Sequence, residues 1–163
     1  MSRAGTIDGL QFARDREVVT GTLALTDLPR LAELGCAAAD VTYSVRGGDN
    51  AEGHPCLAVA ATGSLALRCQ RCLEPLEFAL DVASELALST NEREIATAED
   101  GVDRVLATRS MGVAALVEDE VILALPMAPM HERCEASPAG VERAASSPFA
   151  ALAGLRKDGG GER

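Results

Sequence analysis

The chain has 163 residues, 47% of them apolar and 25% charged, which is typical of a globular domain with a buried core. Its 25 acidic residues outweigh 15 basic ones, and the net charge of -10 should repel a phosphate backbone. With three Phe, one Tyr and no Trp, the chain offers no stacking platform for single-stranded bases. It has no apolar run long enough to span a membrane and no signal-like start, so we expect a cytoplasmic protein.

Between residues 17 and 88, apolar and polar residues alternate as they do in half-buried strands of an antiparallel sheet. We predict four or five strands, centred on residues 19–25, 41–45, 57–61, 65–67 and 76–82. The last two form a hairpin with the loop 69–75. A short helix over residues 26–34, with an Asp or Thr cap, should lie between the first two strands and end at Gly35. From Ser89 to Asp103 the polar, acidic sequence predicts a mobile surface loop.

One main helix is predicted from an N-cap at Ser110 to Leu125, because Pro126 cannot continue it. At 100° per residue its apolar face consists of Val113, Leu116, Val117, Val121, Leu123 and Ala124. Glu120 falls inside that face, and Glu118 and Asp119 lie to its sides. Either the helix bends or ends early, so that Glu120 reaches water, or these carboxylates are held for a cation or a basic partner.

The C-terminal part of the sequence differs from the rest in composition. Residues 135–146 are rich in Ala, Ser, Glu and Gly, and we interpret them as a flexible linker after a domain over residues 1–134. Residues 147–156 predict a short helix in which Phe149, Leu152 and Leu155 form an apolar stripe. Such a helix is too short to be stable alone, so it should dock on its own domain or on a partner. Residues 157–163 are expected to be a disordered tail.

Two pairs of residues have the spacing of metal ligands. The five cysteines are an odd number, which argues against a disulfide framework. Cys69 and Cys72 on the hairpin loop are half of a structural zinc site, and His131 and Cys134 are a compatible second half. The alternative is that these are reduced, metal-free cysteines, some of them buried. Arg68 and Arg71, the one tight basic pair, are interpreted as solvated loop charges.

Three motifs, in the same order, carry a resemblance to a known family. They are the run from Cys69 to Pro75, the run from Leu116 to Pro126 with Pro129 and His131 after it, and the terminal run from Ser147 to Leu152. In these motifs the chain resembles the bacterial YceD family, known as large ribosomal RNA subunit accumulation proteins. The resemblance implies a role in accumulation or processing of large-subunit rRNA as an assembly factor.

We therefore predict an α+β domain, with an antiparallel sheet that could close into a barrel, one main helix and a short C-terminal helix. The function expected is non-catalytic support of ribosome biogenesis, through an acidic surface that binds a basic ribosomal protein or a pre-ribosomal particle. Direct RNA binding should be absent or weak. Two alternatives stay open: a zinc-binding adaptor for protein interactions, and a hydrolase or nuclease that uses Glu118, Asp119 and Glu120 with a divalent ion. The partner-binding candidates are these three carboxylates together with Phe149, Leu152 and Leu155.

Overall fold

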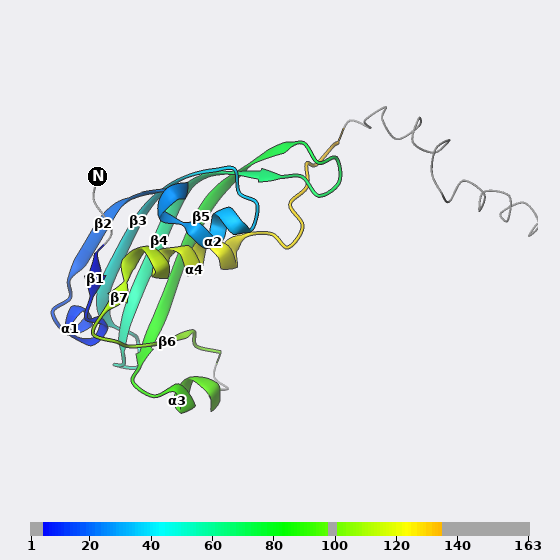
Figure 1. Ribbon diagram of the computed structural model, residues 1–163. Coiled ribbons are helices and arrows are strands. Elements are labelled where there is room, and N and C mark those ends of the chain that lie inside the picture. Colours follow the sequence, from blue (N-terminus) through cyan, green and yellow to red (C-terminus); the bar gives the residue numbers. More distant parts are fainter. Residues whose placement is uncertain (1–4, 98–100, 135–163) are drawn as a thin grey trace, which may run out of the picture.

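The computed structural model describes residues 5–97 and 101–134, and Figure 1 shows how their elements are arranged. A five-stranded sheet makes up most of this part, and helices lie across one of its faces. In chain order the elements are β1 (Thr6–Ile7), α1 (Gly9–Arg14), β2 (Val18–Ala24), the 3₁₀ turn η1 (Leu25–Asp27), α2 (Pro29–Glu33), β3 (Ala38–Asp49), β4 (Pro55–Arg68), β5 (Pro75–Ser89), α3 (Glu92–Thr97), β6 (Arg104–Leu106), β7 (Met111–Gly112) and α4 (Val113–Ala124).

The strand order is β2-β3-β4-β5-β6, and the first four strands pair antiparallel with their neighbours. Strand β6 pairs in parallel with the last three residues of β5. A separate pair joins β1 to β7. Within the described residues β2 and β6 form the two edges, so the sheet is open and the barrel-like closure does not occur. The predicted α+β fold with an antiparallel sheet and one main helix is confirmed.

A single long strand, β4, stands where two separate strands were predicted on either side of Gly63. That glycine pairs with Val41 in the middle of the strand. A Cβ on Gly63 would collide with the backbone carbonyl oxygen of Asp40. Glycine is present because the two backbones approach closely there, and not because the strand ends.

The inner face of the sheet packs against α1, α2 and α4 and forms the core. The largest fully buried side chains that strands and helices contribute to this core are Leu23, Leu31, Val41, Val45, Leu57, Val59, Leu65, Val113, Val117 and Val121. The outer face carries the alternate residues of each strand, and these are mostly exposed. The alternation in the sequence therefore reflects a sheet that is covered on one side only.

Helix α4 differs from the predicted main helix at its start. It begins at Val113, and its N-cap is Gly112 without a side-chain hydrogen bond, so the predicted cap at Ser110 is wrong. Residues 111–112 instead form β7 and pair with β1. The C-terminal end agrees with the prediction, because Leu125 is extended immediately before the proline. Leu123 is 79% exposed and does not belong to the buried face.

The helix predicted between the first two strands is present as α2, and it is followed by Gly35 with a positive φ of 89°. Its N-cap is Leu28 without a side-chain hydrogen bond, so the predicted Asp or Thr cap is wrong. The carboxylate of Asp27 instead accepts a hydrogen bond from the N–H of Ala24, at 3.1 Å, and belongs to the preceding turn η1.

Two short helices were not predicted. Helix α1 starts after Asp8, whose carboxylate accepts a hydrogen bond from the N–H of Gln11 at 3.1 Å. Helix α3 lies in the segment predicted to be a loop, where Ser89 donates a hydrogen bond to the carboxylate of Glu94 at 2.6 Å. Both are six residues long, which is too short to show an apolar period.

The predicted linker (135–146), docking helix (147–156) and tail (157–163) lie outside the described residues, so these boundaries stay predictions. In the part of the chain that the structure describes, no helix has the length and apolar character needed to cross a membrane.

Two neighbouring glycines on β3 test the packing of α1 against the sheet. A Cβ on Gly47 would lie 2.8 Å from the Cα of Ala13, whereas a Cβ on Gly48 would meet nothing within 4 Å. We expect Gly47→Ala to lower the free energy of unfolding by about 2 kcal/mol, because the helix backbone must move. The matched control Gly48→Ala should change it by less than about 1 kcal/mol. Urea-induced unfolding measures both, and equal effects would contradict this packing.

Candidate metal centre

The hairpin between β4 and β5 extends beyond the rest of the sheet and carries Cys69 and Cys72 at its tip (Figure 1). The first residue of β3, Ala38, pairs with Ala66, so the end of β4 pairs with β5 alone. The loop is closed by two backbone hydrogen bonds of 3.0 Å, from Cys69 N–H to the carbonyl of Glu74 and from Leu73 N–H to the carbonyl of Cys69. This tight turn holds the two cysteines on one side of the loop.

The segment after α4 also reaches this loop. Pro126 ends the helix, and residues 126–134 run toward the hairpin tip (Figure 1). The N–H of Gln70 donates to the carbonyl of Pro129 at 2.8 Å, which attaches this segment to the hairpin. The N–H of His131 points to the sulfur of Cys69 at 3.5 Å.

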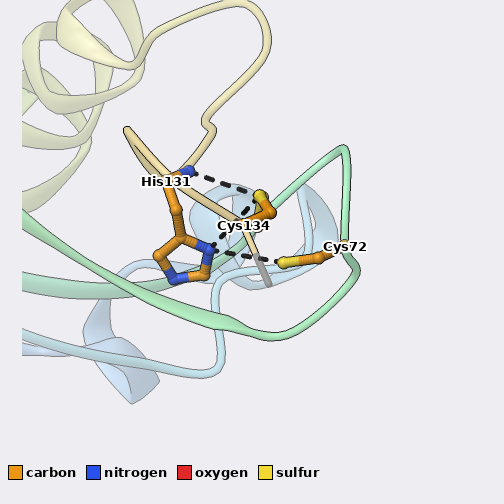
Figure 2. A group of neighbouring side chains, drawn as sticks. Cys72, His131 and Cys134 are labelled. Atoms are coloured by element: carbon orange, nitrogen blue, oxygen red, sulfur yellow. Dashed lines mark hydrogen bonds between the residues drawn. The ribbon is translucent and has the colours of Figure 1, made fainter. Parts of the chain in front are cut away.

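Together the two segments bring all four predicted ligands into one cluster. One donor atom from each of Cys69, Cys72, His131 and Cys134 lies within 4.8 Å of the others, so this group can hold a metal ion. The sulfurs of Cys69 and Cys134 are 3.6 Å apart. Nδ1 of His131 lies 3.3 Å from the sulfur of Cys72 and 4.0 Å from that of Cys134, as Figure 2 shows for these three residues. Zn–S bonds of about 2.3 Å in a tetrahedron place two sulfurs about 3.8 Å apart. The predicted proximity is confirmed, and its dimensions fit zinc.

A hydrogen bond made by Nε2 of His131 orients the ring so that Nδ1 faces the cluster. Its Nε2 lies 3.0 Å from the carbonyl oxygen of Pro75, the first residue of β5. A carbonyl oxygen only accepts hydrogen bonds, so Nε2 carries the proton and Nδ1 presents its lone pair to the cluster. This arrangement is typical of a metal-binding histidine, whose second nitrogen is usually held by an oxygen acceptor.

Backbone donors favour the thiolate form of one ligand. The pKa of the Cys69 thiol is lowered to about 5, mainly because the N–H of Cys72 donates to it; the N–H groups of His131 and Arg71 add to this, and burial opposes it. At Cys72 the N–H of Glu74 lowers the pKa, but burial and the neighbouring thiols outweigh it, so the net shift is upward. A thiolate at neutral pH is the form that binds metal.

Arg71 lies exposed on the loop, as predicted, but it is not a free loop charge. Its Nε donates to the sulfur of Cys134 at 3.0 Å, and an Nη donates to the carbonyl of His131 at 2.9 Å. The Cys134 sulfur raises the pKa of this guanidinium, first by hydrogen bonding and then by its charge. Arg71 therefore joins the two segments of the centre and offsets thiolate charge. Its position between the two loop cysteines is the sequence signal that could have indicated this.

The two remaining cysteines do not belong to the centre. Cys36 and Cys56 are buried in the domain, where burial raises the pKa of both thiols. The centre thus offers three sulfurs and one nitrogen. That set fills a tetrahedral ion and leaves no open position for a substrate or a reactive water, as in structural zinc sites.

The carboxylates of α4 lie in different surroundings. Glu118, with a 3% exposed side chain, accepts hydrogen bonds from Nε of Arg30 and from the N–H of Leu31, both at 3.0 Å. Asp119 forms a second ion pair with the same arginine. Glu120 is also buried, at 7% exposure. Glu118 therefore serves the packing of α4 on α2, and partner binding by the three residues stays a prediction.

An apolar groove that sequence reasoning missed lies directly beside the metal centre. It has a volume of about 510 Å³, and its apolar lining residues include Leu34, Leu67, Ile122, Leu125, Met127 and Pro129, with Arg68 and Gln70 also on its wall. Leu34 is 62% exposed, and the side chain of Met127 is fully exposed. The residues come from α2, β4, α4 and the segment after it, so the groove depends on the same contacts as the centre.

Comparison with known proteins identifies the family. The sequence model of the family described as large ribosomal RNA subunit accumulation protein YceD matches residues 57–156, which is more than half of the chain. The matched region contains all four candidate ligands. The chain belongs to the YceD family. No solved structure matches the chain.

The donor set predicts one bound zinc ion per chain. Zinc measured by elemental analysis after dialysis should be about one equivalent in the wild-type protein and close to zero in Cys72→Ser, because a tetrahedral site loses a ligand. The variant should also melt at a lower temperature, since a bound ion would join the hairpin to residues 126–134. Cys56→Ala is the matched control and should keep its zinc. Wild-type protein without zinc after expression in zinc-supplemented medium would contradict the assignment.

Arg71 is expected to support metal binding without contacting the ion. Arg71→Gln should weaken zinc binding by about ten- to a hundredfold, because the guanidinium orients Cys134 and the carbonyl of His131. Competition with a chromophoric chelator measures the affinity. The control Arg46→Gln removes an exposed arginine from β3 and should have no effect. Equal affinities of the two variants would refute a role of Arg71 at the centre.

Proposed function

We propose that the protein is a non-catalytic factor that supports accumulation and processing of large-subunit rRNA during ribosome biogenesis. The observation that carries this proposal is membership of the YceD family over residues 57–156. The partner would be a basic ribosomal protein or a pre-ribosomal particle, met in the cytoplasm, where ribosomes assemble.

The charge and composition of the chain favour a protein partner over direct rRNA contact. The net charge is -10. The outer face of the sheet exposes Asp40, Glu77, Asp81 and Glu85. The one tyrosine, Tyr43, is 3% exposed and so cannot stack on a base. An acidic surface of this kind attracts basic proteins and repels phosphates.

The metal centre supports this proposal as a structural element. By linking the hairpin tip to residues 126–134, a zinc ion would hold the end of β5 and the apolar groove in fixed positions. The same cluster also favours a second candidate, a zinc-binding adaptor for protein interactions outside ribosome assembly. The two differ in the partner, and the metal chemistry is the same.

A metal-dependent hydrolase or nuclease has less support. Among the three carboxylates of α4, Glu118 is already bound by Arg30 and Leu31, and Asp119 by Arg30. Neighbouring helical residues also point about 100° apart. The donor set of the metal centre is closed and offers no water-activating position. These features argue for a non-catalytic role.

Deleting the gene tests the function. We expect large-subunit rRNA to fall relative to small-subunit rRNA, and the deficit to be corrected by the wild-type gene on a plasmid. Sucrose-gradient profiles and rRNA quantification measure this. Affinity isolation of the protein after high-salt washing, with protein and RNA identified, should retain a basic ribosomal protein. An unchanged rRNA ratio in the deletion strain would rule out the proposed function.

A separate experiment tests whether the protein contacts rRNA only through a protein partner. Filter binding of the purified protein to rRNA fragments at about 0.15 M salt should show no tight complex, because binding at this ionic strength requires several direct Lys or Arg contacts to phosphates and the chain has a net charge of -10. Submicromolar binding without a protein partner would mean that the protein contacts rRNA itself.

A further inference from the structure

Within the described residues, the outer edge of β5 lacks a neighbouring strand over most of its length. Strand β6 covers it only at residues 87–89. Between Glu77 and Glu85, no backbone hydrogen bond within the described part of the chain reaches this edge. An unpaired edge of this length is unusual in proteins, because its free N–H and C=O groups form a template for another strand.

The direction of the backbone groups follows from the contacts at the two ends of the edge. At one end the carbonyl of Pro75 meets Nε2 of His131. At the other, the N–H of Ala87 donates to Asp103, and the carbonyl of Ser89 accepts from Ala107. All three are odd-numbered residues of β5. The N–H and C=O groups of residues 77, 79, 81, 83 and 85 therefore point to the open edge, while the even-numbered residues pair with β4.

The side chains beside the edge have a regular charge pattern. Glu77, Asp81 and Glu85 are exposed on the outer face, with the small residues Ala79 and Ala83 between them. On the inner face Phe78 and Val82 are half-buried and pack against the core. An added strand would thus place alternate side chains opposite carboxylates, and the others next to apolar groups.

We propose that the edge of β5 from Glu77 to Glu85 binds an extended basic segment of a partner protein, which adds to the sheet as a sixth main-sheet strand. The partner would carry Lys or Arg at alternate positions facing the three carboxylates, and apolar residues at the positions between. This inference deepens the proposed function and rests on it for the identity of the partner as a basic ribosomal protein.

A second copy of the chain fits the edge less well than a basic segment. In the antiparallel register centred on Asp81, pairing of two β5 edges would bring the acidic side chains of the two copies opposite one another, and like charges in cross-strand pairs are destabilising. The net charge of -10 on each copy adds to the repulsion. The edge therefore selects a partner by charge.

A synthetic peptide tests the inference on the full-length protein. The probe is an 11-residue peptide in which lysine alternates with valine, with fluorescence anisotropy as the readout. The comparison peptide has the same sequence, with the backbone amides that face β5 N-methylated. It keeps the charge but cannot donate to the edge, so we expect it to bind at least about tenfold more weakly.

Two pairs of variants separate strand addition from general charge attraction. Ala79→Pro removes an N–H that points to the open edge and breaks no bond to β4, so it should fold and weaken binding by about tenfold. Its control Ala79→Ser keeps the N–H and should bind as the wild type. Asp81→Lys should weaken binding more than Asp40→Lys, which makes the same change in net charge on β3, away from the edge. A peptide with glutamate at its central position should restore binding to Asp81→Lys.

Hydrogen exchange followed by NMR gives an independent readout. In the free protein the amides of residues 77, 79, 81, 83 and 85 should exchange quickly, and those of the even-numbered residues between them slowly. The peptide should protect the odd-numbered set. Circular dichroism and melting curves confirm that each variant is folded.

Three results would overturn the inference: unchanged binding by Ala79→Pro, equal effects of the two charge reversals, or no protection of the odd-numbered amides. Dimerisation through this edge in analytical ultracentrifugation would assign it to a second copy instead. If any of these results is obtained but gene deletion still lowers large-subunit rRNA as expected, the proposed function stands and only the strand-addition inference fails. An unaffected rRNA ratio would reject that function whatever the peptide does.

Discussion

The buried carboxylate of Glu118 constrains how the helices sit on the sheet. A charge with 3% of its side chain exposed must be satisfied by donors, and here these are Arg30 and the N–H of Leu31, both on α2. The ion pair joins two helices that lie 88 residues apart in the sequence. Because α4 ends at Ala124, only six residues after Glu118, the fixed orientation of the helix also determines the direction in which residues 126–134 continue from it. That exit leads to the hairpin tip (Figure 1).

The metal centre and the open edge of β5 meet at one residue. His131 presents Nδ1 to the three cysteines and donates from Nε2 to the carbonyl of Pro75, where the edge begins. A metal ion on Nδ1 would hold this ring in place, and the ring would in turn occupy the first acceptor of the edge. The part of the β5 edge that is free to pair with another strand therefore lies between the metal centre at one end and β6 at the other.

Local patterns predicted the parts of this structure that depend on short sequence distances. Period-two alternation predicted β2, β3 and β5, and β4 as two separate strands. Pro126 marked the end of α4, and paired spacing predicted the four candidate ligands. Among contacts over long sequence distances, the approach of the two ligand pairs was predicted, and the others were not. The partner of Glu118 is an arginine from another helix, and Arg71 bonds to Cys134 across 63 residues. Leu123 followed the helical period, yet it is exposed because α4 has a neighbour on only part of its circumference.

The choice of three cysteines and one histidine has a consequence for charge. Three thiolates and a neutral imidazole around Zn²⁺ leave a net charge of about -1, and the guanidinium of Arg71 at 3.0 Å from Cys134 brings the group to about zero. A fourth cysteine in place of His131 would add another negative charge to a chain that already carries -10. It would also lose the hydrogen bond to Pro75, because a zinc-bound thiolate has no proton to donate. Histidine at this position would therefore keep a zinc-loaded centre neutral, and its Nε2 ties the centre to the edge of the sheet.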